Sequence, residues 1–193
     1  MRTGLAALLV LVAGICDLSG GLRAPYPGIS GRGGASAVLS SAAADSVDVS
    51  RGRGLVLKRV LRQGDYRQGR PLPGDEVDLR WEMRLLNGSL VGSSRAYEEA
   101  NGELFRVRFG AEPREMIEGW ELAVATMLEG ELAEIVVRSP AAFGDKGLAQ
   151  LVPPDADLSC TLELVALLPA PSRRFQSVGL NESISEELVE RIQ

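Results

Sequence analysis

Residues 77–85 constrain the fold most strongly, because apolar and charged side chains alternate there without a break. Valine, leucine, tryptophan and methionine occupy the odd positions, and every even position carries a charge. Successive side chains of a strand point to opposite faces, so this period of two predicts a half-buried β-strand. A sheet that buries one face only is typically antiparallel. We therefore expect a domain built on an antiparallel sheet.

Other segments extend this prediction. The pair Asn87-Gly88 is typical of a type I′ hairpin turn, which would return residues 89–91 antiparallel to the first strand. Residues 93–102 are polar and predict a loop. Apolar side chains that line one face only predict four more strands, at 55–61, 105–109, 133–137 and 158–164.

One helix is predicted between these strands. Apolar residues recur at 116, 117, 120, 124 and 127, which is one stripe of a helix, and Gly130 is a plausible end signal. A helix this short is not stable alone, so it should pack on the sheet. The predicted fold class is α+β, with a twisted antiparallel sheet of about five strands wrapped around one short α-helix.

Composition excludes several kinds of chemistry. The 193 residues include no histidine, which removes Ser-His and Cys-His mechanisms and most zinc sites. Two cysteines, Cys16 and Cys160, are too few for a disulfide framework. A net charge of −5 without a basic run argues against nucleic acid as a partner. No cofactor and no metal are expected.

The first 53 residues have the features of a targeting sequence. Residues 1–16 place Arg2 before a short apolar run, as in a signal peptide; a buried helix is the alternative. Residues 17–53 have the composition of a transit peptide or of a disordered linker. Together they resemble the two-part leader of algae with complex plastids. This predicts entry into the secretory pathway and then the plastid, stroma or thylakoid lumen, with secretion or the ER lumen as the alternative and no membrane span in the mature chain.

The globular domain is predicted over residues 54–169, and 170–193 follow it as a linker with a short amphipathic helix. Ile184, Leu188 and Ile192 recur at helical spacing behind a run of acids. Two interpretations of this helix stay open: a packing or partner-contact role, or a frayed end.

Eight sequence blocks of the domain resemble a known family. They are Leu86-Asn87-Gly88, Ser93-Ser94, Phe105 to Gly110, Met116 to Glu121, Met127 to Glu131, Phe143-Gly144, Val152 to Leu158 and Leu162-Glu163-Leu164. In this order and spacing they are similar to the FKBP-type peptidyl-prolyl cis-trans isomerases, the immunophilins that bind tacrolimus and rapamycin. The resemblance covers residues 54–168.

The resemblance implies an apolar groove between sheet and helix that binds a prolyl segment. Trp120 would form its floor, and the 140–154 loop its rim. The resemblance implies four catalytic residues: Phe105, Ile117, Trp120 and Phe143. It implies six substrate-binding residues: Trp81, Val91, Gly92, Met116, Val152 and Cys160. Proline-containing clients are the implied partners, a macrolide is an implied ligand, and we expect a monomer.

Five of these positions depart from the family's usual residue. Gly92 replaces Asp, Val91 replaces Phe, Trp81 replaces Tyr, Cys160 replaces Phe and Phe143 replaces Tyr. Each lost hydrogen bond to a substrate lowers binding by ~1–3 kcal/mol. Two hypotheses follow: an isomerase acting on folding proteins, or a catalytically weak FKBP-like binding or chaperone module. Cys160, inward-facing and without basic neighbours, is interpreted as a small buried hydrophobe and not as a redox thiol.

Overall fold

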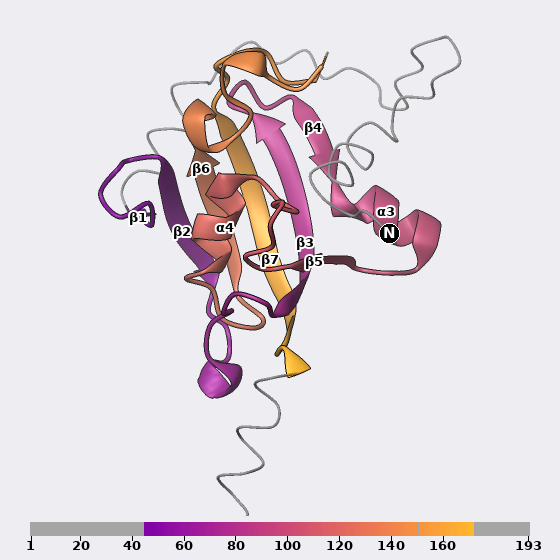
Figure 1. Ribbon diagram of the computed structural model, residues 1–193. Coiled ribbons are helices and arrows are strands. Elements are labelled where there is room, and N and C mark those ends of the chain that lie inside the picture. The colour runs from indigo at the N-terminus through magenta and orange to yellow at the C-terminus, as the bar shows by residue number, and fades with distance from the viewer. Residues whose placement is uncertain (1–44, 150, 172–193) are drawn as a thin grey trace, which may run out of the picture.

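The computed structural model describes residues 45–149 and 151–171 and shows one sheet with a helix across it (Figure 1). The sheet has seven strands in the order β1-β2-β6-β7-β3-β4, with β5 also paired to β3, and every pairing is antiparallel. The strands are β1 (Val47–Asp48), β2 (Val56–Arg62), β3 (Glu76–Leu85), β4 (Leu90–Ser93), β5 (Phe105–Arg108), β6 (Leu132–Val137) and β7 (Leu158–Leu168). The predicted α+β class is confirmed, with more strands than the five expected.

The core lies between the sheet and α4 (Glu118–Val124), which crosses the face formed by β6 and β7 (Figure 1). Four of the five odd-numbered side chains of β3, Val77, Leu79, Trp81 and Met83, are buried on this face, as their alternation predicted, and Leu85 at its end is partly buried. The helix contributes Trp120, Ala123 and Val124 to the same core. Its regular part is shorter than the predicted stripe, because the chain after Val124 turns toward β6.

Residues 93–102 do not form the predicted loop. They contain a second helix, α3 (Ser94–Asn101), which ends where Gly102 adopts a left-handed φ of 69° and donates its N–H to the Glu98 carbonyl at 2.8 Å. Its apolar positions 96, 97 and 100 do have helical spacing, but they are two alanines and one tyrosine in a polar segment, so the signal is weak; Gly102 as a C-terminal glycine was the second clue in the sequence. Shorter 3-10 helices are η1 (Tyr66–Gln68), η2 (Ser139–Ala141) and η3 (Gly144–Lys146).

The hairpin between β3 and β4 is real, but its predicted type I′ turn is wrong. That turn needs positive φ at both central residues, and of the pair only Gly88 has it, at 88°. The Gly88 N–H instead donates to the Leu85 carbonyl at 2.8 Å, and the pairing register shifts between Met83 and Arg84. A longer connection with a glycine at its end and an adjacent bulge replaces the tight turn.

The folded chain also begins before residue 54, the predicted boundary. Val47 pairs with Lys58 in β1, and the Asp48 carboxylate accepts hydrogen bonds from the backbone N–H groups of Ser50 (2.8 Å) and Gly54 (3.0 Å). A strand of two residues is too short to show a period, so only the tertiary pairing reveals it. Residues 1–44 of the predicted leader, and the predicted helix after 171, lie outside the described residues. Within the described part, no helix is long and apolar enough to cross a membrane.

Candidate functional site

Three aromatic side chains form the centre of the predicted site. The ring centroids of Trp81 and Trp120 lie 5.1 Å apart at 55°, and those of Trp81 and Phe105 lie 6.0 Å apart at 73°. These rings come from β3, α4 and β5. The register that places Leu79 opposite Phe105 sets Phe105 diagonally beside Trp81 on the helix-facing side of the sheet. The three rings therefore form one edge-to-face and tilted aromatic cluster.

A backbone donor lies at the start of α4, next to this cluster. Ile117 is the N-cap, and its carbonyl accepts from the N–H groups of Trp120 (3.0 Å) and Glu121 (3.2 Å). The first N–H groups of a helix have no intrahelical acceptor. The N–H of Ile117 itself donates to none of the described residues. The described residues therefore leave this N–H without a hydrogen-bond acceptor.

The remaining predicted site residues lie in or beside the hydrophobic core that contains these rings. Met116, Val152, Val91 and Cys160 are buried in the core that contains the three rings. Gly92 is buried in β4 opposite Met83, and Phe143 is half-buried against this core at the start of η3. The predicted site residues, scattered from position 81 to position 160, are thus all buried or half-buried in the domain whose core contains the three rings.

Most of this site is closed to solvent. Trp120 is fully buried and Trp81 is 3% exposed. The indole Nε1 atoms of both residues are buried and meet no acceptor in hydrogen-bonding geometry among the described residues. Burial raises the pKa of the Cys160 thiol to about 12, with the neighbouring Trp120 opposing that rise, and the expected burial of Cys160 is confirmed. The site is apolar and contains two buried indole N–H groups.

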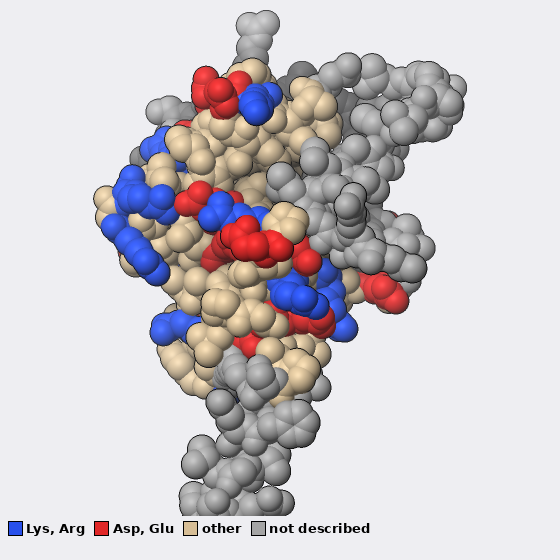
Figure 2. All heavy atoms as spheres, viewed as in Figure 1, with Lys and Arg blue, Asp and Glu red and all other residues tan. Residues whose placement is uncertain are grey.

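Charged residues that sequence reasoning missed surround the start of α4. Arg114 Nε lies 3.0 Å from Glu121 Oε2, and Arg53 Nη2 lies 2.9 Å from Glu118 Oε1. Burial raises the pKa of Glu121, and the nearby Arg114 opposes that rise. Figure 2 shows acidic and basic side chains interleaved on this face of the molecule. Because Arg53 is 65 positions from Glu118 in the sequence, no local spacing rule could have paired them.

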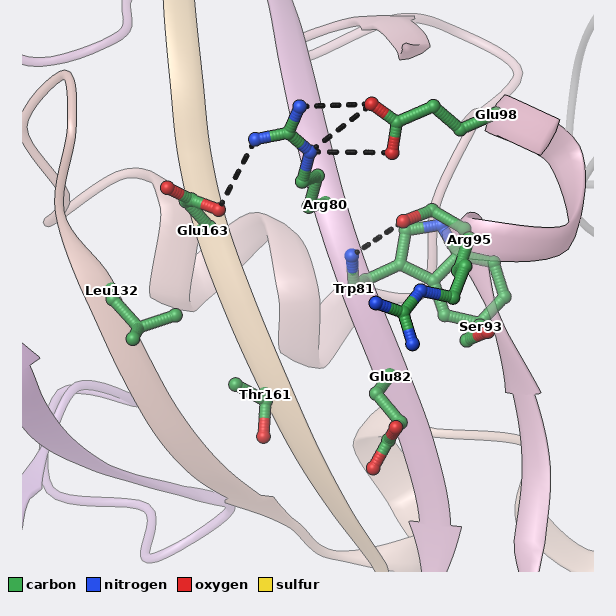
Figure 3. Close-up of a pocket in the computed structure, with 10 residues that line it drawn as sticks. Arg80, Trp81, Glu82, Ser93, Arg95, Glu98, Leu132, Thr161 and Glu163 are labelled. Carbon is green, nitrogen blue, oxygen red and sulfur yellow. Dashed lines mark hydrogen bonds and ion pairs between the residues drawn. The ribbon is translucent and has the colours of Figure 1, made fainter.

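A cavity of about 530 Å³ lies beside α3 (Figure 3). Most of its lining residues are polar or charged and come from β3, β4, α3 and β7, but Trp81 of the predicted site lines it too. Arg80 there donates to Glu98 through Nη2 at 2.8 Å and lies 3.8 Å from Glu163. The hydrogen bond from Arg80 lowers the pKa of Glu98. The Ser94 hydroxyl accepts from the Trp81 backbone N–H at 2.9 Å, which fixes α3 to the strand that carries the site tryptophan. This ion-paired cavity lacks the features of a prolyl groove.

The fold is that of FKBP domains. It matches the crystal structure of the three FKBP domains of wheat FKBP73 with a TM-score of 0.54 and 29% identity, covering 63% of this chain and 48% of that one. It matches FkpA from Escherichia coli with a TM-score of 0.56 over 69% of this chain and 56% of that one; at 21% identity this likeness shows the fold alone.

The sequence comparisons give the family. The model of the FKBP-type peptidyl-prolyl cis-trans isomerases matches residues 68–165. Peptidyl-prolyl cis-trans isomerase FKBP20-1 of Arabidopsis thaliana is 32% identical over 146 residues, covering 74% of this chain and 70% of that protein. FK506-binding protein 5 of Rhizopus delemar is 31% identical over 134 residues, which is 69% of this chain but only 33% of that protein. The chain belongs to the FKBP-type peptidyl-prolyl cis-trans isomerase family.

Proposed function

We propose that this chain accelerates rotation about Xaa-Pro bonds in folding proteins. Family membership supports the reaction type. The observation that carries the proposal is the pairing of an aromatic platform, Trp120 with Trp81 and Phe105, with the free N–H of Ile117 at its edge. The platform would take the prolyl ring, and the N–H would take the substrate carbonyl.

This chemistry needs neither a nucleophile nor a proton donor. The peptide bond is held planar by a barrier of ~18–20 kcal/mol because resonance moves charge onto the carbonyl oxygen. The twisted transition state has lost that resonance and is less polar. An apolar site therefore binds the twisted form better than the planar one, and such differential binding is what lowers a barrier. The absence of histidine is compatible with this route.

The direct test is the refolding of a protein limited by proline isomerisation, with and without the full chain. We expect the slow phase to accelerate. Trp120→Ala is a poor control, because removing a fully buried indole costs ~3–5 kcal/mol of stability. Trp120→Leu is milder, and Leu164→Ala, a buried change in β7 outside the site, is its matched control. Activity lost in a folded Trp120→Leu but kept in Leu164→Ala supports the proposal, and activity kept in both contradicts it.

A second candidate function is a binding module with little catalysis. The burial of Trp81 and its contact with Trp120 favour it, because the indole occupies space beside the platform that a prolyl ring would need. Trp81→Tyr installs the smaller residue that the family usually has. A gain in turnover would assign weak catalysis to the indole. Unchanged, negligible turnover together with measurable binding of a proline peptide would favour the binding module.

Two further parts of the proposal concern the ligand and the compartment. A macrolide of the tacrolimus type is a candidate ligand, and titration would report on the two tryptophans, both of which lie in the site, through their fluorescence. Residues 1–44 are proposed as a two-part leader to a plastid through the secretory pathway, because residues 45–53 belong to the described fold. A reporter fused to these residues that stayed in the cytosol would contradict that assignment.

A further inference from the structure

The first turn of α4 begins at an N-cap residue that cannot cap it. This residue is Ile117, and its hydrocarbon side chain cannot accept the N–H groups that Ser, Thr, Asp or Asn would accept at this position. A helix of seven residues is not stable by itself, and helices fray first at their ends. The same turn carries Trp120, a ring of the aromatic cluster. Its order therefore depends on contacts from outside the helix.

Two arginines hold this turn through its acidic side chains. Glu118 is the first residue of α4; its Oε1 accepts from Arg53 Nη2 at 2.9 Å, and its Oε2 lies 3.5 Å from Arg114 Nη1. Arg114 Nε also lies 3.0 Å from Glu121 Oε2. Acidic side chains in a first turn are in addition favoured by the helix dipole. The arginines thus take the place of a side-chain cap.

One of the two arginines comes from residues 47–54, which we call the N-terminal strap. The Asp48 carboxylate closes the strap by accepting from the backbone N–H groups of Ser50 (2.8 Å) and Gly54 (3.0 Å). The Ser50 carbonyl then accepts from Arg53 Nε at 3.1 Å. This bond orients the guanidinium, so that its Nη2 atom reaches the first residue of α4.

The N-terminal strap precedes the part of the chain that matches the family model, which begins at residue 68. We propose that Arg53 of this strap is a positioning residue for the prolyl-isomerase site, an inference that rests on the proposed function. By holding Glu118, Arg53 keeps the first turn of α4 ordered, and with it the placement of Trp120. The fraction of molecules in which the turn is ordered sets the apparent affinity for a prolyl segment.

The test is Arg53→Gln in the full chain, which removes the charge from a side chain that is half exposed. Exposed ion pairs are weak, so the expected effect is small but measurable. We expect KM for an Xaa-Pro peptide to rise about threefold with kcat unchanged, because saturating substrate restores the ordered turn. Arg53→Lys keeps the positive charge and should recover most of the loss.

Two further variants show whether Arg53 acts through its partner on α4. Glu118→Gln weakens the contacts of both arginines and should raise KM at least as much. In that background Arg53→Gln should have no further effect, because the two residues act as a unit. Arg62→Gln is the matched control: it breaks an ion pair of similar exposure between β2 and Glu163 of β7, and should leave KM unchanged.

Amide hydrogen exchange reports on the turn without relying on turnover. The N–H groups of Trp120 and Glu121, both bonded to the Ile117 carbonyl, should exchange about threefold faster in Arg53→Gln and at the wild-type rate in Arg62→Gln.

The outcomes separate this inference from the proposed function. If the wild-type chain binds a proline peptide without turning it over, the proposed function fails, and peptide affinity replaces KM as the readout. Unchanged exchange in Arg53→Gln overturns the inference, and so does faster exchange with unchanged KM or affinity. An additive effect of Arg53→Gln in the Glu118→Gln background also overturns it. A wild-type chain that neither binds nor turns over the peptide overturns both.

Discussion

Phe143 is the predicted site residue that can be changed with least damage to the core. It is only half-buried, at the start of η3, whereas Trp120 and Ile117 are buried. We expect Phe143→Tyr to restore a hydroxyl that hydrogen-bonds ligand, and to raise kcat/KM on an Xaa-Pro peptide by about 5- to 10-fold, which is ~1 kcal/mol of transition-state binding. Thermal unfolding should not change. An increase in stability without an increase in turnover would show that the hydroxyl does not reach substrate.

At the scale of single residues, the buried thiol of Cys160 makes the stability of the fold depend on pH. Burial raises its pKa to about 12 from the ordinary 9.0, so the folded state keeps the proton that the unfolded state releases. The stability that this provides is complete below pH 9 and is lost as the pH rises toward 12. Relative to Cys160→Val, which has no proton to lose, the wild-type free energy of unfolding should fall by about 1.4 kcal/mol per pH unit above about pH 9. Urea titrations of both proteins between about pH 8 and 10.5 measure this, and parallel curves would contradict it.

At the level of secondary structure, the position of α4 depends on its close approach to β6. A Cβ added at Gly119 would lie 2.3 Å from Val137 Cγ1 and 3.1 Å from the Ala141 carbonyl oxygen. Because Gly119 lets α4 lie this close to β6, the adjacent Trp120 can contact Trp81. The glycine therefore acts on the aromatic cluster indirectly.

Gly119→Ala should therefore destabilise the protein. In an exposed helix the same change would stabilise by up to ~1 kcal/mol, but overpacking here is expected to cost ~1–3 kcal/mol. Val137→Ala removes the clashing methyl groups, so in the double variant Gly119→Ala should cost much less than it does alone. Urea unfolding of the four proteins in this cycle gives the coupling. Additive costs would mean that the helix moves away from β6 instead of clashing with it.

At the scale of the whole molecule, a buried ion pair joins three separate parts of the chain. Lys58 Nζ of β2 lies 2.5 Å from Glu131 Oε1, which precedes β6, and donates at 2.9 Å to the hydroxyl of Thr126, just after α4. Both charged side chains are buried. Burial lowers the pKa of Lys58, and Glu131 opposes that shift. The pair fixes the edge of the sheet to the end of the helix.

Removing one partner should be far worse than removing both. Lys58→Met leaves the Glu131 carboxylate buried without its cation, and we expect a loss of ~3–5 kcal/mol in the free energy of unfolding. Lys58→Met with Glu131→Leu replaces the pair by apolar groups and should recover most of that loss. Denaturant titration of the two variants and of Glu131→Leu measures the difference. Equal losses in the single and the double variant would show that packing, and not the unpaired charge, sets the cost.

Local patterns in the amino-acid sequence were enough to predict the antiparallel sheet and the helix around Trp120, whereas the candidate site residues came from the resemblance to the family. Alternation in 77–85 and the apolar stripe from residue 116 are local signals, because a strand and a helix each repeat their burial within a few residues. Residues 45–53 carry no such period and residues 93–102 only a short, weak one, so β1 and α3 were established by their contacts with β2 and β3.

The burial of the site and the pairing of charges, in contrast, followed from the folded structure alone. The burial of Trp81 against Trp120, the close approach of Gly119 to Val137 and the pairing of Lys58 with Glu131 all join residues far apart in the chain. Side-chain burial and ion pairing depend on distances in space, and these distances are fixed when the sheet closes on its helix. The family resemblance in the sequence nominated the candidate site residues, whereas their mutual packing required the complete fold.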